Sequence, residues 1–360
     1  MRKLLAPIPK ARTLSVMPTY QCTAHCKHCG TYSSPKETTW LDPELITSAI
    51  DQAINAGYKV VVFTGGEPTL AGENLFKYIR QVAEKRICSR IVTNACWADT
   101  EENADLMMNK LIEAGLREVN FSTGDQHARF VDFDNILRAT RAAVKVGCLQ
   151  TIAIMVETVE ERAISKKTIT DHPEYKRIMA DFPKAKIKII ESPWMPLTPN
   201  NIEKYTEGRA LNNANLPMHT GCNSCLTTTT LQADGRIGAC CGLGMRNIPE
   251  LQLGRIDEIS IEEADKRGEN DFLKRWIRVE GPERILAWAA AHDQSIEWEN
   301  MYAHRCQTCI RLYKDKKVRD VIRDHYEEKI PDVLFREWLL HSYNPEEEEA
   351  FPETSTGEGN

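Results

Sequence analysis

The sequence lacks any apolar run long enough to cross a membrane. A membrane-spanning helix needs about 18 or more consecutive apolar residues, and charged or polar residues interrupt every apolar stretch of this chain well before that. The opening stretch, MRKLLAPIPKARTLSV, is basic, but its apolar part is short and broken by proline, unlike a secretory signal. The sequence therefore predicts a cytoplasmic protein without a membrane anchor.

The chain also lacks a bias toward basic charge. Its formal net charge is −6, yet six of its 52 acidic residues and none of its 46 basic residues follow Pro345. The rest of the chain is balanced, whereas nucleic-acid binding requires clustered lysine and arginine. We therefore expect no nucleic-acid partner, and we expect residues 345–360, acidic and poor in large apolar groups, to be a disordered tail.

Cysteine, by contrast, is abundant, with twelve residues. Disulfides are rare in a reducing cytosol, where clustered thiolates more often hold metal. Cys88, Cys96 and Cys148 stand alone, and the other nine form three groups: Cys22, Cys26 and Cys29; Cys222, Cys225, Cys240 and Cys241; and Cys306 with Cys309. These groups predict metal centres.

Residues 13–192 alternate short β-branched runs with amphipathic stretches. The runs predict strands at 13–17, 59–63, 90–93, 118–122, 150–156 and 186–190. Asp42 before Pro43, and Thr100 before two glutamates, are typical helix starts. Apolar strands that alternate with helices indicate a parallel sheet with right-handed crossovers. The sequence thus predicts an α/β fold, a partial (β/α)6 TIM-like barrel with its chemistry at the carboxyl ends of the strands, or alternatively a flat doubly wound sheet.

Composition divides the chain further. Residues 1–12 are predicted to form a short N-terminal extension before the first strand. The proline-rich SPWMPLTPNN ends the alternating region, and residues 193–315 form a small cysteine-rich domain. Residues 316–344 are predicted to be C-terminal helices that pack on the body through Trp338, Leu339 and Leu340.

The segment QCTAHCKHCG places Cys22, Cys26 and Cys29 in a C-x3-C-x2-C spacing directly after the first strand. Three thiolates are one ligand short of a closed tetrahedral site. A zinc ion would take His25 or His28 as its fourth ligand, whereas an iron–sulfur cluster would keep one iron open for an external ligand. The position at a strand end favours the cluster. So does TGGEP after the second strand, whose glycines allow close backbone approach and whose acid can receive an ammonium group.

Together these two motifs resemble the radical SAM superfamily. The cysteine triplet is similar to its C-x3-C-x-Φ-C motif, with His28 where an aromatic residue is usual, and the turn is similar to its GGE(P) motif through Gly65, Gly66, Glu67 and Pro68. The resemblance implies a [4Fe–4S] cluster whose open iron is chelated by the amino and carboxylate groups of S-adenosylmethionine, with the turn holding the amine. It also implies reductive cleavage to a 5′-deoxyadenosyl radical, hydrogen-atom abstraction from a substrate, and a flavodoxin or ferredoxin as electron donor.

Further residues follow the predicted strands. The resemblance implies that Asn94 and Ser122 lie near the S-adenosylmethionine. Asp125 and His127, in STGDQH, are candidate acid/base residues, although both also suit a turn. Cys96, just past the third strand, is a candidate hydrogen-atom donor or a simple buried thiol.

The second cysteine field predicts another metal centre. Asp234 and Gly235 are a strong turn pair inside LQADGRIGAC, so a hairpin would bring distant thiolates together. C-x9-G-x4-C followed by C-x2-C resembles the SPASM domain, or its one-cluster version, twitch. The resemblance implies an auxiliary [4Fe–4S] cluster held by Cys225, Cys240, Cys306 and Cys309, with Cys222 and Cys241 as alternates; a zinc ribbon is the alternative.

These features predict a radical SAM enzyme with one auxiliary cluster. Relatives of this architecture imply a ribosomally made peptide as substrate, modified by cross-linking, thioether formation or epimerisation. An alternative is a dehydrogenase or rearrangement enzyme acting on a small polar metabolite. A zinc- or cluster-binding protein without S-adenosylmethionine chemistry is the non-enzyme alternative.

Overall fold

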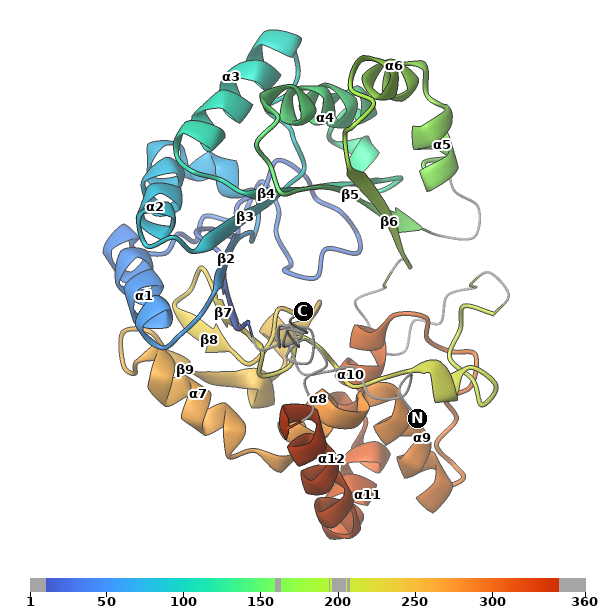
Figure 1. Cartoon of the computed structure of the whole chain (residues 1–360). Helices are drawn as coiled ribbons and strands as arrows, with labels where there is room; N and C mark the ends of the chain where they lie inside the picture. Colours follow the sequence, from blue (N-terminus) through green and yellow to red (C-terminus); the bar gives the residue numbers. More distant parts are fainter. Residues whose placement is uncertain (1–10, 159–162, 194, 196–204, 206–207, 343–360) are drawn as a thin grey trace, which may run out of the picture.

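A computed structural model describes residues 11–158, 163–193, 195, 205 and 208–342, organised around one nine-stranded sheet (Figure 1). The strand order is β6-β5-β4-β3-β2-β1-β7-β8-β9, an open arrangement. The first six strands are all parallel: β1 (Thr13–Val16), β2 (Val60–Phe63), β3 (Cys88–Thr93), β4 (Glu118–Gly124), β5 (Thr151–Thr158) and β6 (Ile187–Pro193). The predicted partial barrel and its six strands are confirmed.

Helices cover the outer face of these strands in Figure 1. They are α1 (Pro43–Asn55), α2 (Glu73–Glu84), α3 (Glu101–Glu113), α4 (Phe133–Val146), α5 (Lys166–Asp171) and α6 (Pro173–Asp181). The Asp42 carboxylate accepts a hydrogen bond from the Glu44 amide, and the Thr100 hydroxyl accepts one from the Asn103 amide. Both predicted helix starts are therefore confirmed. They were predictable because capping depends on residues close together in the sequence.

Alternation along the strands separates a core from a cavity. Leu14, Val61 and Ile91 are fully buried and belong to the main hydrophobic core, which also includes residues of the outer helices. Ser15 and Val62, one position along, line a cavity on the other face. Successive strand residues point to opposite faces, so the same short strands build both the core and the wall of the site.

The cysteine-rich region continues the same sheet. β7 (Thr228–Leu231) pairs in parallel with β1, and β8 (Arg236–Gly238) and β9 (Gln252–Arg255) follow in antiparallel pairings. The predicted hairpin at Asp234 and Gly235 is confirmed, with φ of +85° at the glycine. Because β7 lies beside β1, the second cysteine field is fixed next to the strand that leads into the first.

Helices make up much of the remaining described chain and lie in the lower part of Figure 1. They are α7 (Ile261–Glu269), α8 (Phe272–Glu280), α9 (Pro282–His292), α10 (Arg305–Lys314), α11 (Lys316–His325) and α12 (Ile330–Ser342), and a 3-10 turn, Tyr326–Lys329, joins the last two. Within the described chain, no helix combines the length and apolar character needed to cross a bilayer.

The prediction that Trp338 packs on the body is wrong. Its side chain is 60% exposed, whereas Leu340 is 8% exposed. The reason is the neighbouring Glu337, which is buried in ion pairs with Arg275 and Arg278 of α8. Successive side chains of an α-helix are rotated by about 100° around the helix axis. Because Glu337 points toward the body, the side chain of Trp338 faces solvent. Residues 1–10 of the predicted extension (residues 1–12) and the predicted acidic tail (residues 345–360) lie outside the described residues.

Candidate functional site

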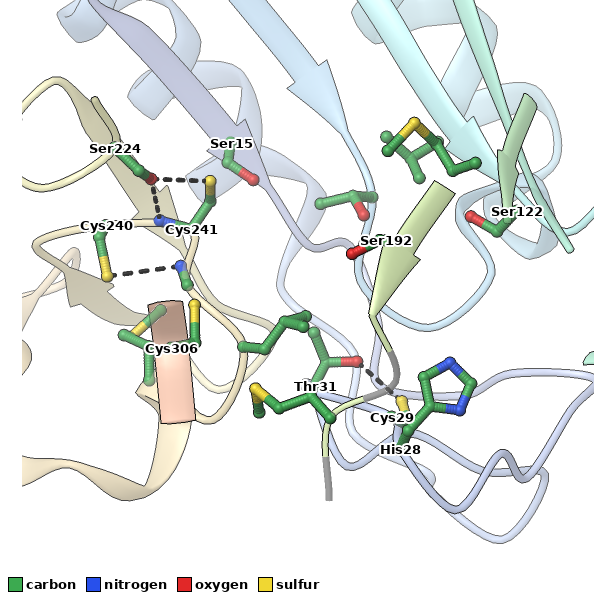
Figure 2. Close-up of a pocket in the computed structure, with 18 of the residues that line it drawn as sticks. Ser15, His28, Cys29, Thr31, Ser122, Ser192, Ser224, Cys240, Cys241 and Cys306 are labelled. Carbon is green, nitrogen blue, oxygen red and sulfur yellow. Dashed lines mark hydrogen bonds between the residues drawn. The ribbon is translucent and has the colours of Figure 1, made fainter. Parts of the chain in front are cut away.

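One cavity of about 720 Å³ lies at the carboxyl ends of the parallel strands. Its wall includes the whole first cysteine group and all six cysteines of the other two groups. Figure 2 shows Cys29 and His28 on one side of this space, and Cys240, Cys241 and Cys306 on the other. Folding therefore brings three groups that are far apart in sequence to a single space.

The first cysteine group lies in the loop between β1 and α1. The Ala24 amide donates to Cys22 Sγ at 3.4 Å, and the Ser33 amide donates to Cys29 Sγ at 3.3 Å. Burial nevertheless raises the pKa of Cys22 to about 12. Thiolates in such a loop need a positively charged partner to offset desolvation. The donor set therefore suits a metal centre.

The TGGEP turn packs directly against this loop. The Gly66 amide donates to Thr19 O at 3.0 Å, and the Glu67 amide donates to Gln21 O at 2.8 Å. A Cβ at Gly66 would lie only 1.9 Å from Gln21 O, and Gly65 has φ of +118°. The glycines are needed because backbone lies against backbone here. The result is a tight cradle beside the cysteines, lined by main-chain atoms.

The Glu67 carboxylate is occupied by the protein itself. The side chain is 1% exposed. Its oxygens accept hydrogen bonds from the Thr69 amide and hydroxyl, the Thr93 hydroxyl and the Asn94 amide. Burial raises the pKa of this carboxyl, and the donated hydrogen bonds oppose that rise. Glu67 thus ties the turn after β2 to the end of β3.

Asn94, directly after β3, and Ser122, within β4, both line the cavity wall. The Asn94 side-chain amide donates to the Thr23 hydroxyl at 3.0 Å and approaches Cys22 Sγ at 3.6 Å. Ser122 lies within β4 and lines the same cavity (Figure 2). Both residues therefore border the space in front of the cysteine loop.

A histidine–glutamate pair lies on the same wall. His127 Nδ1 is 3.0 Å from Glu157 Oε2, and Glu157 Oε1 accepts from the Gln126 amide at 2.6 Å. His28 meets the His127 ring edge-on at 5.4 Å, and burial lowers the pKa of His28 to about 4, so its imidazole is neutral. A carboxylate that binds Nδ1–H leaves Nε2 of His127 as the basic nitrogen.

The sequence did not identify Glu157, because the predicted fifth strand ended one residue before it. The sequence did contain one signal for Glu157: an acidic residue at the carboxyl end of a buried strand, where the site of this fold lies. Its buried carboxylate organises the turn after β4 as well as the His127 ring.

Asp125 closes a neighbouring loop, and Cys96 lies beside Thr23 of the cysteine loop. The Asp125 carboxylate accepts from the amides of Ala163 and Ile164 at 3.2 and 2.8 Å, which closes a loop. Cys96 is half-buried, and its amide donates to the Asn94 side chain at 3.0 Å. Neither residue lines the cavity. Their catalytic roles stay predictions.

Two thiols of the second cysteine field, those of Cys240 and Cys306, lie beside Gly242. A Cβ there would lie 3.3 Å from Cys240 Sγ and 3.4 Å from Cys306 Sγ, so both sulfurs point at the same small space. Cys306 and Cys309 share the first turns of α10. The glycine leaves room between the thiols that a larger residue would fill.

The two alternative ligands, Cys222 and Cys241, have different contacts from their neighbours Cys225 and Cys240. Cys225 is buried, and its thiol donates to Lys274 O at 3.5 Å. Cys222 instead interacts with the Arg305 guanidinium. Cys241 is exposed and lies 3.0 Å from the Ser224 hydroxyl. The Cys225 thiol thus has a backbone acceptor, whereas Cys222 lies beside a cation.

The sulfurs are spread more widely than one ion requires. Among the described residues, no group of three ligand atoms within 4.8 Å of one another includes a cysteine. A tetrahedral zinc ion, with Zn–S of about 2.3 Å, needs sulfurs roughly 4 Å apart. The spacing therefore favours a centre larger than a single zinc ion.

Comparison with known proteins agrees with this geometry. The family model described as the radical SAM superfamily matches residues 16–167. These residues form a radical SAM domain. The family implies a [4Fe–4S] cluster and S-adenosylmethionine as cofactors. No curated protein sequence matches the chain.

Three solved structures are similar to this chain at low sequence identity. The structure of anSMEcpe with AdoMet and the Cp18Cys peptide is 15% identical with a TM-score of 0.51, covering 92% of this chain and 99% of that one. SuiB of Streptococcus suis with its precursor peptide SuiA is 15% identical, with a TM-score of 0.44 over 74% of this chain and 66% of that one. BtrN with AdoMet and 2-DOIA is 15% identical, with a TM-score of 0.42 over 75% and 88%.

The radical SAM domain is joined closely to the second cysteine field. The Gly244 amide donates to Gly30 O at 2.9 Å, and a Cβ at Gly30 would collide with Leu243. The Arg246 guanidinium donates to Thr31 O at 3.1 Å and stacks over the Tyr20 ring at 3.6 Å. These contacts fix the loop after Cys240 and Cys241 against the residue that follows Cys29.

Proposed function

We propose that the protein is a radical SAM enzyme that reductively cleaves S-adenosylmethionine and abstracts a hydrogen atom from a ribosomally made peptide. One observation carries this proposal: the cysteine triplet, the TGGEP turn and the second cysteine field all border one cavity. This arrangement supports a reductive centre, a cradle for the cofactor and a second redox centre around one substrate space.

The residues present fit a cluster with one open iron. Cys22, Cys26 and Cys29 would hold three of its corners, and the bound cluster and S-adenosylmethionine supply one-electron cleavage to a 5′-deoxyadenosyl radical. The carbonyls of the Gly65–Gly66 turn would hold the methionine amine, because the Glu67 carboxylate is already hydrogen-bonded within the protein. Asn94, Ser122 and His28 would border the nucleoside.

We assign the proton-accepting role to His127. It is the only one of the three predicted catalytic residues, among the cavity-lining residues described, that faces this space. Glu157 holds its Nδ1, so Nε2 can take a proton from the substrate. The buried carboxylate also stabilises the imidazolium that results.

The second cysteine field would hold an auxiliary [4Fe–4S] cluster. The contacts support Cys222, rather than Cys225, beside Cys240, Cys306 and Cys309, because the Cys225 thiol is committed to Lys274 O. The Arg305 guanidinium beside Cys222 would stabilise a thiolate ligand.

Paired serine variants test this ligand choice. We expect Cys222→Ser to lose about four of about eight irons per chain, because one cluster lacks a ligand, while Cys225→Ser keeps them. Iron and sulfide analysis of anaerobically reconstituted protein measures this. Iron loss in Cys225→Ser alone would restore the assignment made from sequence spacing.

A peptide substrate is supported by the fold likeness to anSMEcpe, which was solved with a bound peptide and matches nearly the whole chain. The test is anaerobic turnover with dithionite and S-adenosylmethionine, with and without a precursor peptide encoded beside the gene. We expect 5′-deoxyadenosine and a peptide that has lost two hydrogens, or has taken up solvent deuterium at unchanged mass.

The outcomes of this experiment separate the alternatives. No 5′-deoxyadenosine from protein with intact clusters contradicts radical SAM activity. 5′-Deoxyadenosine with an unmodified peptide, but with an oxidised or rearranged small polar metabolite, contradicts only the peptide assignment.

A further inference from the structure

A cluster of metal-binding side chains lies outside the cavity, among the C-terminal helices. His292 ends α9, His325 ends α11, and Glu328 lies in the turn before α12. One ligand atom of each lies within 4.8 Å of the other two. The imidazole rings are 4.7 Å apart, and His292 Nε2 is 3.1 Å from Glu328 Oε1.

Trp288 orients two of these three side chains. Its backbone carbonyl lies 3.0 Å from His292 Nδ1, and its indole N–H donates to Glu328 Oε1 at 2.8 Å. A hydrogen bond from Nδ1 to a carbonyl fixes the tautomer that leaves Nε2 free to bind metal, as is usual for metal-binding histidines. Trp288 itself packs against the fully buried Trp276 at 4.8 Å.

We propose that His292, His325 and Glu328 form a binding site for a divalent transition ion of the zinc class. Two imidazoles and a carboxylate are a common three-residue zinc set, with water in the fourth position. The site is independent of the cavity and its cofactors. It would link α9 to α11 and to the turn before α12, and thereby stabilise the C-terminal helices.

The arrangement suits this ion class better than a simple ion pair. One histidine is enough to pair with Glu328, yet a second imidazole is held beside the first. Two adjacent imidazoles repel each other when both are protonated, whereas a bound cation requires both to be neutral. The side chains are partly exposed, so an ion from solvent has access.

Zinc itself is the probe, with the iron–sulfur holoenzyme, whose cluster-binding cysteines are occupied. We expect one zinc per chain after anaerobic dialysis against a buffered Zn²⁺ solution, and a higher midpoint of thermal unfolding. His325→Ala removes a ligand and should weaken zinc binding by about 100-fold or more. Trp288→Phe removes an orienting hydrogen bond and part of the packing on Trp276, but no ligand, and should weaken zinc binding by about 10-fold to 100-fold.

His341→Ala, at the exposed end of α12, is the matched control and should bind zinc like the parent. His325→Cys keeps a zinc ligand at the position and should retain binding, which separates lost coordination from lost folding. Equal zinc content and equal thermal shift in the parent and His325→Ala would overturn the proposal. Those results would leave the cavity and its proposed chemistry unaffected.

Discussion

Alanine at Cys26 is expected to remove about half of the iron and to abolish formation of 5′-deoxyadenosine. Cys26 is the most buried cysteine of the triplet, 8% exposed, and it lies in the loop that packs against the TGGEP turn. A three-cysteine cluster that loses one thiolate has two protein ligands, which does not hold a cubane stably. We expect at least about a 1,000-fold loss of S-adenosylmethionine cleavage, because the electron-donating centre is absent.

Cys148→Ala is the control, because Cys148 is an exposed single cysteine outside the cavity. It should retain iron, the brown colour of the protein and activity. The measurements are iron and sulfide content and 5′-deoxyadenosine by mass spectrometry after anaerobic reconstitution. If the parent protein held zinc and no iron at this loop, or if Cys26→Ala retained full cleavage, the proposed cluster would be excluded.

Alanine at Gly66 is expected to disable the same site without removing a ligand. The new Cβ would lie 1.9 Å from Gln21 O, a backbone atom that cannot move independently of the cysteine loop. Either the turn or the loop must shift, and overpacking of this kind costs about 1–3 kcal/mol of stability. Because that shift moves Cys22 relative to the turn, we expect S-adenosylmethionine affinity and cleavage to fall by roughly 100-fold or more.

Gly57→Ala is a matched control for this variant. Gly57 has φ of +88°, and a Cβ there meets nothing within 4 Å, so the change adds backbone strain without a collision at the site. It should lower the midpoint of thermal unfolding while leaving S-adenosylmethionine binding unchanged. Isothermal titration and thermal denaturation separate the two effects. Normal cofactor affinity in Gly66→Ala would contradict the view that this turn is the cofactor cradle.

Local features of the fold were predictable from the sequence. The six strands, the caps at Asp42 and Thr100 and the turn at Gly235 depend on residues within a few positions of one another. The failure at Trp338 is equally physical. Trp338 was expected to be buried because it is a large apolar residue in a terminal helix. Instead Glu337 points toward the body, because it forms ion pairs with Arg275 and Arg278 of α8.

Nonlocal pairings were not predictable. The spacing of the cysteines does not indicate that β7 pairs with β1. It also does not indicate that the Cys225 thiol is hydrogen-bonded to Lys274 O, or that Cys222 lies beside Arg305. The pairing of Glu157 with His127 spans 30 residues. The group of His292, His325 and Glu328 likewise exists only because three helical segments end at one place.

The sequence by itself determined the chemistry available to this protein: three cysteines ready for a cluster, a glycine turn that only close backbone packing explains, and strands whose ends must meet at one edge. The tertiary structure decided which of the many thiols, imidazoles and carboxylates face one another across the cavity. The reason is physical: residue type and local spacing fix ligand identity and backbone geometry, whereas the distance between remote side chains depends on how the whole sheet and its helices pack.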